Sequence, residues 1–87
     1  SYGATIHVFD PVADVDEAFH EYGIRLTSWN DLPRAGAIVA AVAHRELKNR
    51  PVSDYLGKLA PRGVVIDVKS QFAANAFHGH GVSVWRL

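Results

Sequence analysis

The sequence predicts an α/β fold with an open parallel sheet of about five strands in the order 2-1-3-4-5 and helices on both faces. Strand-like segments alternate with helical ones along the chain, which is the pattern of right-handed strand–helix–strand crossovers. The segment AIVAAVAH, residues 37–44, is apolar on both faces, as expected for a central strand of a parallel sheet. The 87 residues are enough for one small domain.

The first strand and the first helix have clear boundary residues. Residues 5–10, TIHVFD, are β-branched and aromatic, and Pro11 ends the strand. Asp14 is placed to cap a helix over residues 14–23, in which apolar side chains recur at helical spacing. Gly23 is the expected stop of that helix.

The second half is predicted to contain the centre of the sheet. After the strand at 37–44, a helix is expected over residues 52–60, with Tyr55, Leu56 and Leu59 as its buried stripe. Pro61 and Gly63 are read as the end of that helix. The remaining predicted elements are a weak strand at residues 24–28, a short helical turn at 28–35, a strand at 64–69, a loop or short helix at 70–79 and a closing strand at 82–87.

Composition excludes several classes of protein. Nine basic residues balance nine acidic ones, which argues against a nonspecific nucleic-acid binder. The absence of cysteine excludes disulfides, thiolate metal sites and a cysteine nucleophile, and it favours a cytoplasmic origin. No segment approaches the ~20 apolar residues of a membrane-spanning helix, so no membrane partner is expected.

Polar side chains follow three of the predicted strands at the points where those strands end. Carboxyl ends of parallel strands meet at one edge of the sheet, where ligands bind in open α/β proteins. We therefore take these residues as candidate ligand contacts. They are Asp10 after the first strand, His44 and Arg45 after the third, and Asp67, Lys69 and Ser70 after the fourth.

Each of these residues also has a purely structural interpretation. Asp10 is expected to form an Asx turn with Pro11, and Asp67 to accept hydrogen bonds from loop amides. His44, at the tip of a buried strand, is more simply a hydrogen-bonded structural histidine. For Lys69 taken alone, a solvated or salt-bridged role competes evenly with ligand contact.

No cofactor or metal motif is found in the sequence. It has no GxGxxG, no GxxxxGK[ST] and no GxSxG, so no cofactor is expected to bind this chain. His78 and His80 could share a metal, but no third ligand is evident and no metal site is predicted. A phosphoacceptor domain would have an Asp at the end of the third strand, where this chain has His44.

Five segments, in order, resemble the C-terminal, UDP-binding domain of the UDP-glucose/GDP-mannose dehydrogenase family. They are YGATIHVFDP, EYGIRL, AIVAAVAHRE, GVVIDVKS and a closing strand that ends in WRL. The stretch AVAH is similar to the branch that acts on UDP-N-acetylhexosamines, so His44 reads as a branch marker. The resemblance implies a three-layer, Rossmann-like sheet.

The resemblance also implies an activity for the parent protein. Such enzymes oxidise the C6 alcohol of a nucleotide sugar to a uronic acid, through successive hydride transfers to NAD+. An N-terminal domain binds NAD, a cysteine forms the covalent intermediates, and the parent is a homo-oligomer. Lys69 falls where the family has a basic residue that faces the UDP-sugar, and Arg45, His44, Ser70 and groups near Asp10 are expected beside it.

Because the chain lacks the cysteine and the NAD motif, we expect residues 1–87 to be a single nucleotide-sugar-binding domain without catalytic residues. The domain would be truncated at its N-terminus, excised from a larger bacterial dehydrogenase of polysaccharide precursor synthesis, and inactive alone. Two alternatives stay open at this point. One is a flavodoxin-like binding or regulatory module, and the other is an assembly module that pairs through an open strand edge.

Overall fold

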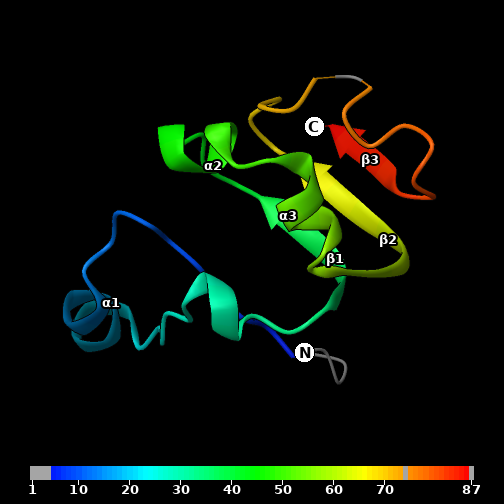
Figure 1. Ribbon diagram of the computed structural model, residues 1–87. Helices are drawn as coiled ribbons and strands as arrows, with labels where there is room; N and C mark the ends of the chain where they lie inside the picture. Colours follow the sequence, from blue (N-terminus) through cyan, green and yellow to red (C-terminus); the bar gives the residue numbers. More distant parts are fainter. Residues whose placement is uncertain (1–4, 74, 87) are drawn as a thin grey trace. The chain divides into compact units, whose positions relative to one another are not determined.

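The computed structural model describes residues 5–73 and 75–86. It confirms the α/β class, with short helices and a parallel sheet of three strands (Figure 1). The chain divides into two compact units, Ser1–Leu32 and Pro33–Leu87. None of the helices in the described part of the chain is long and apolar enough to cross a membrane.

The second unit contains the sheet. Its strands are β1 (Ala35–Ala40), β2 (Leu59–Asp67) and β3 (Ser83–Arg86), all parallel and in the order β1-β2-β3. These strands correspond to the third, fourth and fifth predicted strands, and they lie side by side in the predicted strand order (Figure 1). The sheet of the second unit therefore shows the last three positions of the expected order, without the first two.

One face of this sheet is covered and the other is largely open. Val65 of β2 is completely buried, whereas Ile66 points to the opposite face and pairs with Val39 and Trp85. Val39 and Trp85 are 60% and 64% exposed. Helices on both faces were predicted, so the coverage of a single face in this unit differs from the expectation.

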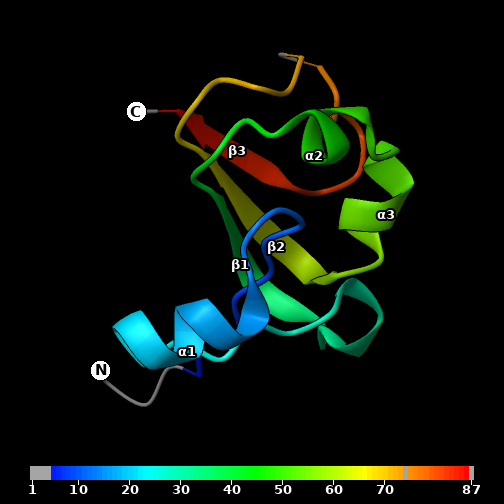
Figure 2. The same cartoon turned by 90° about the vertical axis from the view of Figure 1, so that its left-hand side faces the viewer.

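The covered face is packed by the connections between the strands. The helices α2 (Arg45–Asn49) and α3 (Val52–Leu56) connect β1 to β2, and α3 contacts β2 (Figure 2). Tyr55 of α3 meets Phe72 and Phe77 of the β2–β3 connection edge to face, with ring centroids 5.0 and 6.5 Å away. These three rings are buried and form the core of the unit.

The helix predicted over residues 52–60 is shorter in the structure. It ends at Leu56, and Leu59 already belongs to β2, although Leu59 is buried as expected. Residues 60–63 of β2 lie opposite the single residue Gly36 of β1, which makes a bulge with several extra residues. The proline and glycine that were interpreted as a helix stop therefore lie inside a strand.

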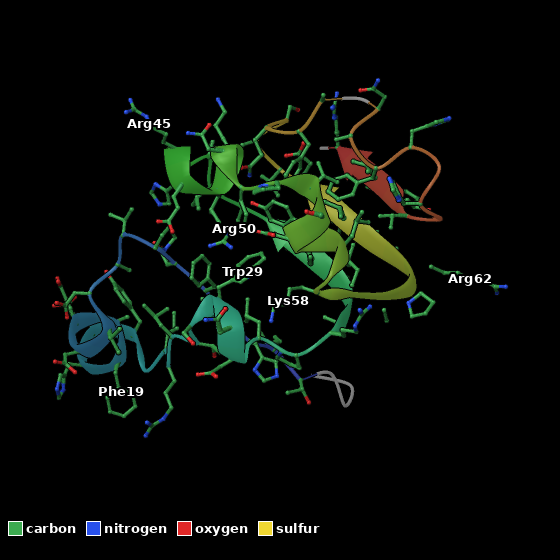
Figure 3. All side chains as sticks on the ribbon, viewed as in Figure 1. Phe19, Trp29, Arg45, Arg50, Lys58 and Arg62 are labelled. Atoms are coloured by element: carbon green, nitrogen blue, oxygen red, sulfur yellow. The ribbon has the colours of Figure 1, made fainter. Side chains whose placement is uncertain are left out.

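The bulge depends on two unusual backbone positions. Arg62 has a φ of 61°, and its side chain points outward from the bulge (Figure 3). A Cβ on Gly63 would lie 2.9 Å from the Cδ2 of Leu59 and 3.0 Å from the carbonyl oxygen of Ala60. Only glycine fits this close return of the chain without displacing its neighbours.

The first unit contains helix α1 (Val15–Tyr22), bounded as the sequence predicts. The Oδ1 of Asp14 accepts a hydrogen bond from the Glu17 amide at 2.9 Å. Gly23 is left-handed, with φ 68°, and its amide donates to the Phe19 carbonyl at 2.9 Å. Both caps satisfy backbone groups that the helix itself leaves unpaired.

The two strands predicted in the first unit are reduced to one point of pairing. Residues 5–10 and 24–28 meet in a single parallel bridge between Val8 and Leu26. An isolated pair of short strands is only marginally stable in water, and the limited pairing in this unit agrees with that rule. The helical turn expected after them is confirmed as the 3-10 helix η1 (Trp29–Asp31).

Candidate functional site

The connections that leave β1 and β2 are linked at the carboxyl edge of the sheet. The Nε2 of Gln71, in the connection after β2, donates to the carbonyl oxygen of Val42, in the connection after β1, at 2.9 Å. The Val68 amide donates to the Ala40 carbonyl at 3.1 Å. The structure therefore brings together the two segments that carry the candidate residues of the second unit.

Asp67 ends β2 as a buried carboxylate, with no exposed surface. Its Oδ1 accepts from the Gln71 amide at 2.9 Å and its Oδ2 from the Phe72 amide at 3.1 Å. The Nε of Arg86 lies 3.9 Å from Oδ2. The expected role in holding loop amides is confirmed, and it explains why an apolar strand ends in an acid.

Lys69 and Ser70 form the exposed part of the turn that Asp67 holds. Ser70 has a φ of 50°, and its amide lies 3.4 Å from the Asp67 carbonyl, which closes the turn. Both side chains are exposed at the carboxyl edge of the sheet. Ligand contact by these two residues stays a prediction.

His44 does not lie at a strand tip, as the sequence indicated. Pairing between β1 and β2 ends at Ala40, opposite Asp67, and His44 occupies the N-cap position of α2. The apolar run extends past Ala40, the last paired residue, and for this reason the sequence predicted a strand that is too long at its end. His44 is half-buried.

Arg45 borders a shallow hollow of about 480 Å³ on α2, lined by Ala43, Arg45, Lys48 and Asn49. The Arg45 side chain extends away from the helix (Figure 3). Sequence reasoning missed Lys48 and Asn49, although their i+3 and i+4 spacing from Arg45 places all three on one helix face.

The acidic residue on α2 pairs with an arginine that does not line the hollow. Glu46 lies 3.8 Å from Arg50, and Arg50 also donates to Asp54 of α3 at 3.1 Å. None of these three residues lines the hollow. The charged side chains that do line it, Arg45 and Lys48, are both cations, so the hollow favours an anion.

Asp10 belongs to the first unit, where its side chain holds a turn, and ligand contact by Asp10 stays a prediction. Its Oδ1 accepts from the amides of Val12 at 2.9 Å and Ala13 at 3.1 Å. This is the Asx turn with Pro11 that the sequence predicts. Within the second unit, the candidate residues near the carboxyl edge of the sheet are His44 and Arg45 with Lys69 and Ser70.

Within residues 5–73 and 75–86, no three His, Cys, Asp or Glu side chains are grouped to hold a metal ion. The chemistry that the edge offers is recognition of an anion by lysine and arginine side chains, together with backbone and serine hydroxyl groups of the turn.

The comparison with protein families gives one match over most of the chain. Residues 1–74 match the model of the UDP binding domain of the UDP-glucose/GDP-mannose dehydrogenase family. No curated protein and no solved structure matches the chain.

Proposed function

The chain belongs to the UDP-glucose/GDP-mannose dehydrogenase family and carries its UDP-binding domain, and from this premise we propose that it binds a UDP-sugar at the carboxyl edge of its sheet. The parent protein would be an NAD-dependent dehydrogenase that oxidises the sugar C6 alcohol to a uronic acid. Through AVAH the chain resembles enzymes of UDP-N-acetylhexosamines, and we propose a substrate of that class.

The observation that carries this proposal is the arrangement of charge at the edge. Lys69 and Ser70 are exposed on the turn after β2, and Arg45 and Lys48 on the helix after β1. The acid at the end of β2, Asp67, is buried and directed at backbone amides. The edge therefore presents cations outward, as a diphosphate requires.

The remaining parts of the reaction belong to other domains of the parent. This chain contains no cysteine to form a covalent intermediate and no glycine-rich NAD motif. Its contribution is to hold the nucleotide sugar, so that closure against the NAD-binding domain excludes water and fixes the C6 hydroxyl near the hydride acceptor.

A ¹⁵N–¹H NMR titration of this chain with UDP tests the proposal. We expect chemical-shift changes at Ala43–Arg45 and at Lys69–Gln71 with millimolar UDP, and no such changes with NAD+. Lys69→Ala should weaken UDP binding by about tenfold or more, because each charge-assisted hydrogen bond to phosphate contributes on the order of 1.5–3 kcal/mol.

Lys58→Ala is the matched control, because Lys58 precedes β2 and so lies at the amino end of the strand. This variant should bind UDP like the wild type. The proposal is wrong if millimolar UDP shifts no amide, or if the shifts gather at the amino end of β2 instead.

A further inference from the structure

The turn after β2 is held at both of its ends. At the start, the Val68 amide donates to the Ala40 carbonyl of β1 at 3.1 Å. At the end, the amides of Gln71 and Phe72 donate to the two carboxylate oxygens of Asp67. The exposed residues Lys69 and Ser70 lie between these fixed points.

Phe72 is fixed through its amide, its carbonyl and its ring. Its amide donates to Asp67 at 3.1 Å, and its carbonyl accepts from the Nη2 of Arg86 at 2.6 Å. Its ring is buried between Tyr55 and Phe77, with centroids 5.0 and 5.3 Å away. The far end of the turn is thus attached to β3, to α3 and to the end of β2.

A buried carboxylate is a costly way to end an apolar strand. Removing a charged group from water is unfavourable unless hydrogen bonds and an opposite charge replace the water. At Asp67 the replacements are two backbone amides of the turn and the nearby Arg86. A valine here would leave those two amides without acceptors, so the acid specifically supports the shape of the turn.

We propose that Asp67 is a positioning residue, whose buried carboxylate sets the turn that presents Lys69 to the diphosphate of the bound nucleotide. The inference rests on the proposed function, because it requires Lys69 to contact UDP. Asp67 itself, fully buried and occupied by backbone amides, does not touch the ligand.

A double-mutant cycle on this chain, with UDP affinity measured by NMR titration, separates positioning from general stabilisation. Asp67→Asn keeps the shape of the side chain but replaces one acceptor oxygen with an NH2 donor. In the Lys69 background, Asp67→Asn should weaken UDP binding by about fivefold to tenfold, or ~1–1.4 kcal/mol. In the Lys69→Ala background, the same change should alter UDP affinity less than about twofold.

An equal loss of affinity in both backgrounds would show that Asp67 only supports the fold, and it would overturn the inference. No effect of Asp67→Asn in the Lys69 background would overturn it too. Failure of the proposed function looks different, because the wild type would then show no UDP binding at all.

Asp54→Asn is the matched control, because Asp54 is an acid of the same unit that pairs with Arg50 and not with the amides of the turn. It should leave UDP affinity unchanged in both backgrounds. If Asp67→Asn does not fold, Arg86→Gln replaces it in the cycle, since this change removes the donor to the Phe72 carbonyl. The same background dependence is then expected, and its absence overturns the inference.

Discussion

At the scale of single residues, Tyr55 shows how the small core accommodates a polar group. The side chain is 3% exposed, and its hydroxyl donates to the Leu47 carbonyl at 2.5 Å. Burial raises the pKa of Tyr55 above its ordinary value of 10.0; the positive charge of Arg50 opposes this and the negative charge of Asp54 adds to it. The folded protein therefore favours the neutral phenol.

The shifted pKa of Tyr55 predicts a loss of stability in alkali. The unfolded chain releases the phenol proton near the ordinary value of 10.0, and the folded chain releases it only at higher pH. The contribution of Tyr55 is thus complete below about pH 10 and is lost as pH rises through the folded-state pKa. Urea unfolding between about pH 7 and about pH 11 should show this fall in the free energy of unfolding.

Tyr55→Phe should reduce that dependence on pH and lower stability at neutral pH by about 0.5–1.5 kcal/mol, through loss of the hydrogen bond to Leu47. Tyr22→Phe, at a tyrosine that is 73% exposed, is the control and should change neither. An alkaline fall that is identical in the wild type and in Tyr55→Phe would contradict the assignment to Tyr55.

Several residue roles could be predicted from the sequence because they depend on neighbours two to five positions away. The Asx turn of Asp10, the caps at Asp14 and Gly23, and the amide contacts of Asp67 are all of this kind. Such hydrogen bonds form within one turn of backbone, so the residue type and its spacing determine them.

At the scale of elements, the bulge in β2 should be sensitive to any side chain at Gly63. Gly63→Ala places a Cβ 2.9 Å from the buried Leu59 side chain and 3.0 Å from a backbone oxygen. We expect a loss of about 1–3 kcal/mol in the free energy of unfolding, the usual cost of overpacking. Chemical unfolding at neutral pH measures it.

Gly57→Ala is the matched control for the bulge. A Cβ at Gly57 would meet its nearest atoms at 3.5 Å, an ordinary contact, and the backbone there is right-handed helical. It should be neutral or stabilise the protein by up to ~1 kcal/mol. Equal effects of the two substitutions would mean that backbone entropy, and not the close approach, governs Gly63.

Element boundaries were the least predictable feature, because they depend on pairing partners distant in the sequence. Leu59 and Ala60 continue a helical pattern, but parallel pairing with Ala35 draws Leu59 into β2. In the same way, the apolar run to His44 outlasts the ladder, which ends at Ala40. Local propensity could not reveal either competition.

At the scale of the whole molecule, the buried residues are unevenly distributed. All the buried hydrophobic side chains of the described residues lie in the second unit, namely Tyr55, Leu59, Val65, Phe72 and Phe77. The described part of the first unit has one helix, one 3-10 turn and a single bridge. The order of the last three strands was predictable from alternation, whereas this difference between the units was not.

Native-state hydrogen exchange should reflect that difference. The amides of Val64–Asp67, in the strand with neighbours on both sides, should be the slowest to exchange. Those of α1 should exchange at least about tenfold faster, because no α1 side chain is buried. Equal protection of α1 and β2 would mean that the two units unfold as one cooperative body.

The candidate site was predictable in composition more than in detail. Lys69, Ser70 and Arg45 were identified because polar residues at strand ends are conspicuous, and they share one edge through the Gln71 contact. Gln71 itself carried no signal in the sequence, since its side chain acts across the fold on Val42. Its role depends on the register between β1 and β2.

The hydrogen bond from Gln71 to Val42 also ties together the two connections that follow β1 and β2. The Oε1 of the same amide is buried without a hydrogen-bond partner, so the Gln71 side chain is held by its Nε2. Together with the hydrogen bond from the Val68 amide to the Ala40 carbonyl, this bond opposes separation of the two connections. If the proposed function is right, a nucleotide bound at this edge would lie across both connections and not between them.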